Sequence, residues 1–209
     1  MKFTFISDTH SLHNKLILEA GDVLIHCGDF TNKGSLEDAE DFADFMAKQD
    51  FQYKIVIAGN HDFCFEDDRL DEAEHLFKDR EIIYLNDSGT EVEGLKIWGS
   101  PIQPQFFNWA FNRNRGHDIS WHWNLIPDDV DILITHGPAF GILDRIKEGD
   151  KVGCHDLLDR VKQIKPKIHA FGHIHEDYGM VEQDGTIFIN ACSVDRRYRL
   201  VNLPIEIEL

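Results

Sequence analysis

The sequence lacks several features, and each absence excludes a class of protein. No run of 18 or more apolar residues occurs among the 209 residues, which excludes a predicted membrane-spanning helix. The four cysteines form no CxxC pair, and none has the His and acid context of a convincing nucleophile. Internal repeats, low-complexity tracts and linkers are also absent, so we expect a single domain over residues 1–209.

Positive charge is scarce: 21 Lys and Arg stand against 38 Asp and Glu, for a formal net charge of −17. Polyphosphate surfaces favour Lys and Arg, so this balance argues against a binder of long nucleic acid or of an anionic membrane. A small phosphate-bearing substrate stays compatible with it, and bound divalent cations would neutralise part of the excess. The opening residues, MKFTFISDTH, resemble a first strand rather than a secretory signal, so we expect a cytoplasmic protein with reduced thiols.

Short apolar runs rich in branched residues predict five buried strands, over residues 3–6, 23–26, 53–58, 132–135 and 168–171. Helical patterns lie between them, at 35–46, 69–77 and 152–164. Alternating patterns at 91–98, 179–190 and 204–209 predict further strands, with hairpin turns at Gly94 and Asp184-Gly185. Strands that alternate with helices and then form hairpins indicate an α/β layered sandwich with mixed sheets.

Residues capable of chemistry stand directly after the five predicted strands, where α/β folds gather their ligands. In chain order they are Asp8-Thr9-His10, Gly28-Asp29, Gly59-Asn60-His61-Asp62, His136-Gly137-Pro138 and Gly172-His173-Ile174-His175. Any one of these motifs is a weak signal, because Asp or His at a strand end is often a turn or cap residue. All five in order, each at a strand exit, predict one common site.

The ligand types in this set predict a metal centre. Carboxylate oxygen and imidazole nitrogen suit Zn, Mn, Fe, Co and Ni, and the absence of Cys argues against a Cys-rich structural zinc site. Seven candidate ligands are too many for one ion: Asp8, His10, Asp29, Asn60, His136, His173 and His175. They fit two ions if a carboxylate bridges them, and Asp29 is the natural bridge. Two ions about 3.5–4 Å apart form a clamp for in-line attack at phosphorus by a hydroxide held between them.

The ordered set DxH, GD, GNHD, H and GHxH resembles the calcineurin-like metallophosphoesterase superfamily, with every motif position filled. Longer stretches resemble its metallophosphoesterase-domain-containing (MPPED) branch over nearly the whole chain, among them ISDTHS, GDVLIHCGDFTN, KIVIAGNHD, DILITHGP and AFGHIHEDYG. The resemblance implies a four-layer α-β-β-α sandwich of mixed sheets, within the α/β class.

The resemblance also implies which residues hold each ion. One ion would take Asp8, His10, Asp29 and His175, and the other Asp29, Asn60, His136 and His173. Mn is the favoured metal, with Fe, Zn, Co and Ni as alternatives. His61 would face the scissile phosphate as a catalytic group, and Asp62 would orient its imidazole. Some members of the branch carry Gly in place of His173 and are weak enzymes that hold nucleotide monophosphates tightly, whereas this chain keeps the histidine.

These features predict a dinuclear metal-dependent phosphodiesterase. The resemblance points to 2′,3′-cyclic nucleotides first and to 3′,5′-cyclic nucleotides or related small phosphodiesters second. Two alternatives stay open: a phosphomonoesterase, including a protein phosphatase, and a nucleotide-binding regulator with weak catalysis. Intact His61 and His173 argue against the regulator.

Several residues are expected to contact the substrate directly: Asn60, His61, Asn32 and Arg113. Arg113 belongs to an aromatic, locally basic stretch, residues 106–116, which could stack a nucleobase or could simply pack over the sheet. Asn32 lines the pocket or forms a turn.

Other histidines and arginines lack motif context. We expect His26 and His169 to be core residues, because both stand within apolar runs. His13 and His122 are expected to be surface or loop residues, with His13 the likelier exception of the two. The basic cluster 196–199 is expected to be solvated, with a homodimer contact as the sharper alternative.

Overall fold

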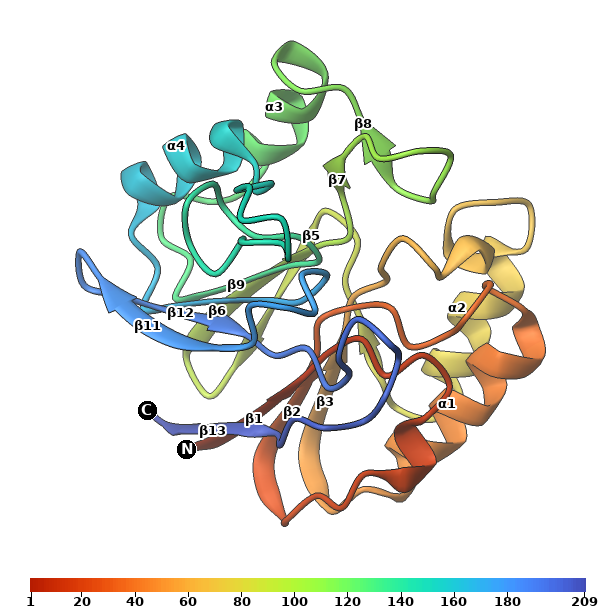
Figure 1. Ribbon diagram of the computed structural model, residues 1–209. Coiled ribbons are helices and arrows are strands. Elements are labelled where there is room, and N and C mark those ends of the chain that lie inside the picture. Colours follow the sequence, from red (N-terminus) through yellow and green to blue (C-terminus); the bar gives the residue numbers. More distant parts are fainter.

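The branched apolar runs form the central strands of two sheets in the computed structural model, which describes residues 1–209 (Figure 1). The first sheet has the strand order β13-β1-β2-β3-β4. Its strands are β1 (Lys2–Ile6), β2 (Gly21–His26), β3 (Phe51–Val56), β4 (Ile83–Tyr84) and β13 (Ile205–Glu208). All neighbours pair in parallel except β13, which closes one edge antiparallel to β1.

The second sheet has the order β11-β12-β10-β9-β6-β5. Its strands are β5 (Ser88–Val92), β6 (Leu95–Ser100), β9 (Ile132–Thr135), β10 (Ile168–Phe171), β11 (Gly179–Gln183) and β12 (Thr186–Asn190). The four inner strands are parallel, and antiparallel hairpins form both edges. A short parallel pair, β7 (Gln103–Pro104) and β8 (Asn112–Arg113), stands apart from this sheet.

Helices cover the outer face of each sheet (Figure 1). The first sheet carries α1 (Leu36–Lys48) and α2 (Leu70–Lys78), and the second carries α3 (His117–Trp123) and α4 (His155–Ile164). Helix α1 begins where the sequence predicts, because the Ser35 hydroxyl accepts a hydrogen bond from the Asp38 backbone N–H at 3.0 Å. Two 3₁₀ turns, η1 (His13–Lys15) and η2 (Phe63–Phe65), lie in the loops.

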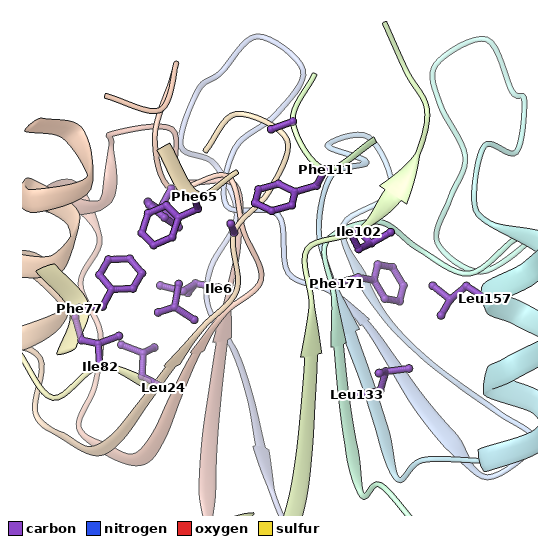
Figure 2. Packing of buried hydrophobic residues seen from close by; sticks show 14 of the residues in the cluster. Ile6, Leu24, Phe65, Phe77, Ile82, Ile102, Phe111, Leu133, Leu157 and Phe171 are labelled. Carbon is purple, nitrogen blue, oxygen red and sulfur yellow. The ribbon is translucent and has the colours of Figure 1, made fainter. Parts of the chain in front are cut away.

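The alternation of side chains along the strands separates the core into layers. Ile25, Ile132 and Ile134 point between the sheets, in a cluster of 16 buried residues. Their neighbours Leu24 and Leu133 point outward and pack with helix residues in a second cluster of 32 (Figure 2). The predicted four-layer α-β-β-α sandwich is therefore confirmed.

The register of the parallel strands brings their carboxyl ends to one level. Ile6 pairs with His26, and His26 pairs with Val56, so the loops after β1, β2 and β3 leave the first sheet together. In the second sheet, Ile134 pairs with Ala170 near the ends of β9 and β10. This arrangement places the loops that carry the five motifs at a common edge.

A few backbone contacts join the two sheets at this edge. Ser7 and Cys192 form a parallel bridge, and the Ser193 N–H donates to the Ser7 carbonyl oxygen at 2.8 Å. The Gly172 N–H donates to the His136 carbonyl oxygen at 2.9 Å, which links the loops after β9 and β10. The Ser7 contacts therefore fix the loop after β1 in the first sheet against the loop after β12 in the second, and the Gly172 contact fixes two loops of the second sheet against each other.

Two histidines differ from the expectation of a surface position. His13 is fully buried, with Nε2 2.9 Å from an Asp41 carboxylate oxygen. His122 is also buried and contacts Asp87 through Nδ1 and Arg113 through Nε2. Both are held by acids distant in sequence, so no local pattern could reveal their burial.

The predictions of free thiols and of core histidines are confirmed. All four cysteines are buried and free, and His26 and His169 have no exposed surface. None of the helices has the length and apolar content needed to cross a bilayer.

His169 gives a pH dependence of stability. Its Nε2 lies 2.8 Å from the Thr135 hydroxyl oxygen, while its Nδ1 is buried without a partner. Burial lowers the pKa of His169 to about 3, below its value in the unfolded chain. As the pH falls below about 6.5, His169 therefore becomes protonated in the unfolded state but stays neutral in the folded state. The unfolded state is stabilised by this proton, so the unfolding free energy decreases.

The unfolding free energy of the wild type should fall as the pH drops from 6 to 4. We predict that this fall is less steep in His169→Leu, by up to about 1.4 kcal/mol per pH unit. Urea unfolding at a series of pH values measures the slope, with the exposed His117→Leu as the control. An unchanged slope in His169→Leu would show that this imidazole is not excluded from protonation.

Candidate metal centre

The structure brings the motif residues of all five loops together. Three groups form, each with ligand atoms within 4.8 Å of one another: Asp8, His10 and His175; His10, Asp29 and His61; Asp29, His136 and His173. His10 and Asp29 each belong to two of these groups, so neighbouring groups share ligand atoms. These groups could hold metal ions.

The spacing within the first group fits a coordination sphere. The Nε2 atom of His175 lies 3.1 Å from Asp8 Oδ1 and 3.4 Å from His10 Nε2. The His10 Nε2 atom is 3.9 Å from Asp29 Oδ2. Ligand atoms about 2.0–2.2 Å from a shared tetrahedral ion lie about 3.4 Å from one another, so these residues fit a cation.

The second half of the site has the same character. The Nε2 atom of His136 lies 3.4 Å from Asp29 Oδ2 and 2.9 Å from the side-chain oxygen Oδ1 of Asn60. The ring of His173 stands with its centroid 5.0 Å from that of His136. An amide oxygen, a carboxylate oxygen and two imidazoles make a donor set suited to a divalent transition metal.

Hydrogen bonds from outside this set orient its members. His136 Nδ1 donates to the Cys27 carbonyl oxygen at 3.0 Å, which leaves Nε2 free to face Asp29. Asp8 Oδ2 accepts from the Ser7 hydroxyl at 2.6 Å and from the His173 backbone N–H at 2.9 Å. The remaining oxygen of Asp8 therefore points to the first group.

The backbone at the site is strained. Asp8, His10, Asp29 and His173 all have left-handed conformations, with φ between 42° and 68°. Such a conformation costs a non-glycine residue about 1–3 kcal/mol and persists only where surrounding contacts impose it. Strain at four candidate ligands indicates that the fold is built to hold them in place.

Two glycines permit the close packing of these loops. A Cβ atom at Gly172 would lie 2.0 Å from Asp8 Oδ2 and 2.1 Å from the Ser7 hydroxyl oxygen. A Cβ atom at Gly59 would lie 2.4 Å from Asp29 Oδ1. Only glycine fits at either position while the candidate ligands keep their places.

Asp62 differs from the expectation that it orients His61. Its Oδ2 accepts from the backbone N–H groups of Asp29 and Gly59, at 2.9 and 2.8 Å. Its Oδ1 accepts from the backbone N–H and the hydroxyl of Thr31, at 2.9 and 2.7 Å. Burial and the charge of Asp29 raise the pKa of Asp62 to about 7 against these donors. This carboxylate joins the loop after β2 to the loop after β3.

The His61 ring takes its orientation from other groups. Its Nδ1 donates to the Asn32 carbonyl oxygen at 2.7 Å, and its face stacks on Trp109 with a centroid distance of 4.2 Å. The free Nε2 atom then lies 4.0 Å from Asp29 Oδ2. Asn32 thus acts through its backbone, and Trp109 packs on an imidazole of the site.

Burial and opposite charges set the protonation states. Burial would raise the pKa values of Asp8 and Asp29, but the surrounding imidazoles hold both well below the usual range. Burial lowers the pKa of His10 to about 4 and that of His173 to about 3. The opposite holds for His136, where Asp29 outweighs burial and raises the pKa to about 9. Beside Asp8, the pKa of His175 is also raised. Metal ligands have to be ionised carboxylates and neutral imidazoles, so His136 and His175 would have to release their protons when an ion binds.

Arg113, an expected substrate contact, is engaged elsewhere. Its guanidinium donates to Glu66 at 3.1 Å and to His122 Nε2 at 3.1 Å. Tyr198, by contrast, lies against His10 and His175, with ring centroids 4.8 and 5.4 Å away. Sequence reasoning missed Tyr198 because no motif surrounds it.

Comparisons with known proteins agree with this geometry. A family model described as calcineurin-like phosphoesterase matches residues 1–177. Metallophosphoesterase domain-containing protein 1 of Homo sapiens is 40% identical over 230 residues, covering 100% of this chain and 71% of the relative. A UPF0046 protein from Caenorhabditis elegans is 36% identical, with 98% of this chain and 74% of the relative covered.

Solved structures share the fold at low sequence identity. The phosphopantetheinyl hydrolase of Mycobacterium tuberculosis has a TM-score of 0.64 at 15% identity, covering 94% of this chain and 90% of that one. TT1561 of Thermus thermophilus has a TM-score of 0.64 at 14% identity, with 93% and 89% covered. These likenesses concern the fold alone.

We predict that Gly172→Ala lowers the unfolding free energy by about 1–3 kcal/mol or more and weakens divalent-metal binding, because its methyl group would displace Asp8. Chemical denaturation and calorimetric titration with Mn²⁺ measure both effects. Gly137→Ala is the matched control, since a Cβ there would lie 4.0 Å from its nearest neighbours, Gln103 Cβ and His173 Cδ2. Equal behaviour of the two variants would contradict the tight-packing explanation.

Proposed function

The chain belongs to the calcineurin-like phosphoesterase family, in its metallophosphoesterase-domain-containing branch, and on that premise we propose that it is a metal-dependent phosphodiesterase. Its substrates are cyclic nucleotides, 2′,3′-cyclic before 3′,5′-cyclic, or related small phosphodiesters. The observation that supports this most is the position of Asp29 in two overlapping groups of candidate ligands.

We propose that two divalent ions, Mn by preference, bind at these groups. The first would be held by Asp8, His10, Asp29 and His175, and the second by Asp29, Asn60, His136 and His173. When bound, the ions would polarise the phosphoryl oxygens of the ester and offset its negative charge.

His61 is proposed to act on the substrate itself. Its Nδ1 is committed to the Asn32 carbonyl, so Nε2 is the atom that can hold a proton at the site. An imidazole that carries a proton on Nε2 can donate a hydrogen bond to the phosphoryl group and pass that proton to the leaving oxygen. The stack on Trp109 restricts the ring to this orientation.

Asp62 has a positioning role in this proposal. Its carboxylate accepts hydrogen bonds from the backbone N–H groups of Asp29 and Gly59. Asp29 is the proposed bridging ligand, and Gly59 directly precedes Asn60. Asn60 would then contribute its side-chain oxygen to an ion and lie beside the substrate.

We also propose that residues 1–209 form one domain that works in the cytoplasm. Support for the compartment comes from the four buried free thiols, which suit a reducing environment.

The first test compares ester classes. With Mn²⁺ present, we predict that kcat/KM for bis-p-nitrophenyl phosphate exceeds that for p-nitrophenyl phosphate by at least about tenfold, and that 2′,3′-cyclic nucleotides are turned over. Chromatography of the nucleotide products identifies which bond is cleaved. A strong preference for the monoester would favour a phosphomonoesterase instead.

The second test separates metal ligation from the role of His61. We predict that Asp29→Ala loses nearly all activity together with bound metal, because both ions share its carboxylate. His61→Ala should keep its metal and lose activity by about 10²–10⁴-fold, the usual contribution of a positioned acid or base. Elemental analysis of the purified variants measures the metal, with exposed His117→Ala as the control. Loss of both ions from His61→Ala would make His61 a ligand.

A further inference from the structure

A pocket of about 440 Å³ opens beside the candidate metal centre. Gly137 and His173 line it, and each belongs to a motif loop, so the pocket is continuous with the site. Its volume lies within the range of small-molecule sites, about 300–1,000 Å³. A phosphoryl group held at the metal centre could therefore extend its organic part into this space.

Apolar groups form the walls, among them Phe106, Pro138 and Ile174. The Phe106 ring stands edge-on to His173, with a centroid distance of 6.4 Å. Asn112 on β8 fixes this segment, because its side-chain NH₂ donates to the Phe106 carbonyl at 3.1 Å and its Oδ1 accepts from the Phe106 N–H at 3.3 Å. These apolar walls could pack against a flat ring.

Three charged residues complete the pocket: Arg115, Lys151 and Glu176. None of them forms an ion pair with another residue of the chain. The Arg115 guanidinium donates to the carbonyl oxygens of Val152 and Gly153, both at 2.8 Å, which fixes it on the wall and leaves its other N–H groups unused. Two cations and one carboxylate are thus available to a ligand.

We propose that this pocket binds the base of the nucleotide substrate and prefers guanine. Guanine presents the adjacent acceptors O6 and N7 to cations such as Arg115 and Lys151. On its next edge it presents the N1–H and N2–H donors, which suit the Glu176 carboxylate. Adenine places a donor, its N6 amino group, where guanine has O6, so it cannot satisfy both cations. The inference rests on the proposed function, because the metal centre has to hold the phosphate.

The experiment compares guanosine and adenosine 2′,3′-cyclic phosphates with bis-p-nitrophenyl phosphate, in the Mn²⁺-loaded protein. We expect kcat/KM for the guanosine ester to exceed that for the adenosine ester by about tenfold, chiefly through KM. Lys151→Met and Glu176→Gln should each bring this ratio towards one. Lys147→Met is the matched control, because Lys147 is exposed in the same loop but does not line the pocket, and it should keep the wild-type ratio.

Calorimetric binding of 5′-GMP and 5′-AMP gives a readout that does not need catalysis. Tighter binding of GMP than of AMP, lost in Lys151→Met, would support a guanine-binding pocket whether or not a diester is hydrolysed. The absence of diester hydrolysis would overturn the proposed function alone. Diester hydrolysis with equal kcat/KM for the two bases would overturn the pocket and leave the proposed function standing. Equal binding of GMP and AMP would also overturn the guanine-binding pocket. So would a loss of guanine preference in Lys147→Met as large as that in Lys151→Met.

Discussion

The burial of two ionised carboxylates is the constraint on which the rest of the site depends. Asp8 and Asp29 are almost completely buried, yet the imidazoles around them keep both pKa values low. Charges removed from water are stable only when partners compensate them. Protonated His136 and His175 supply that compensation, and a divalent cation bound there would replace their protons and supply it instead. The chemistry proposed for this chain follows from that need.

The fold supplies this arrangement through rigid elements and accepts local strain. Within each sheet the parallel strands end at one level, and their loops carry left-handed backbone at four candidate ligands. Asp62 ties two of these loops, and Gly172 lets a third approach Asp8. The loops are thus preorganised, and binding energy would not be spent on folding them.

Much of the fold and the candidate ligand set could be predicted from the sequence, because both depend on local patterns. Branched apolar runs indicate strands, and the motifs stand at their exits. Contacts set by tertiary packing could not be predicted in this way. Three contacts depend on how distant loops meet: the hydrogen bond from the Asp29 N–H to Asp62, the stack of Trp109 on His61, and the packing of Tyr198 against His10. His13 lacks motif context, and its acid partner Asp41 lies on α1, so the residues around His13 do not reveal its burial.

We propose above all that two ions share the Asp29 carboxylate. Electron paramagnetic resonance of the Mn²⁺-loaded protein, combined with a metal count for each chain, tests it directly. Two Mn²⁺ ions per chain with the spectrum of an exchange-coupled pair are predicted, because a common carboxylate would place the ions about 3.5–4 Å apart. A single isolated Mn²⁺ signal at saturation, with one ion per chain, would contradict the claim.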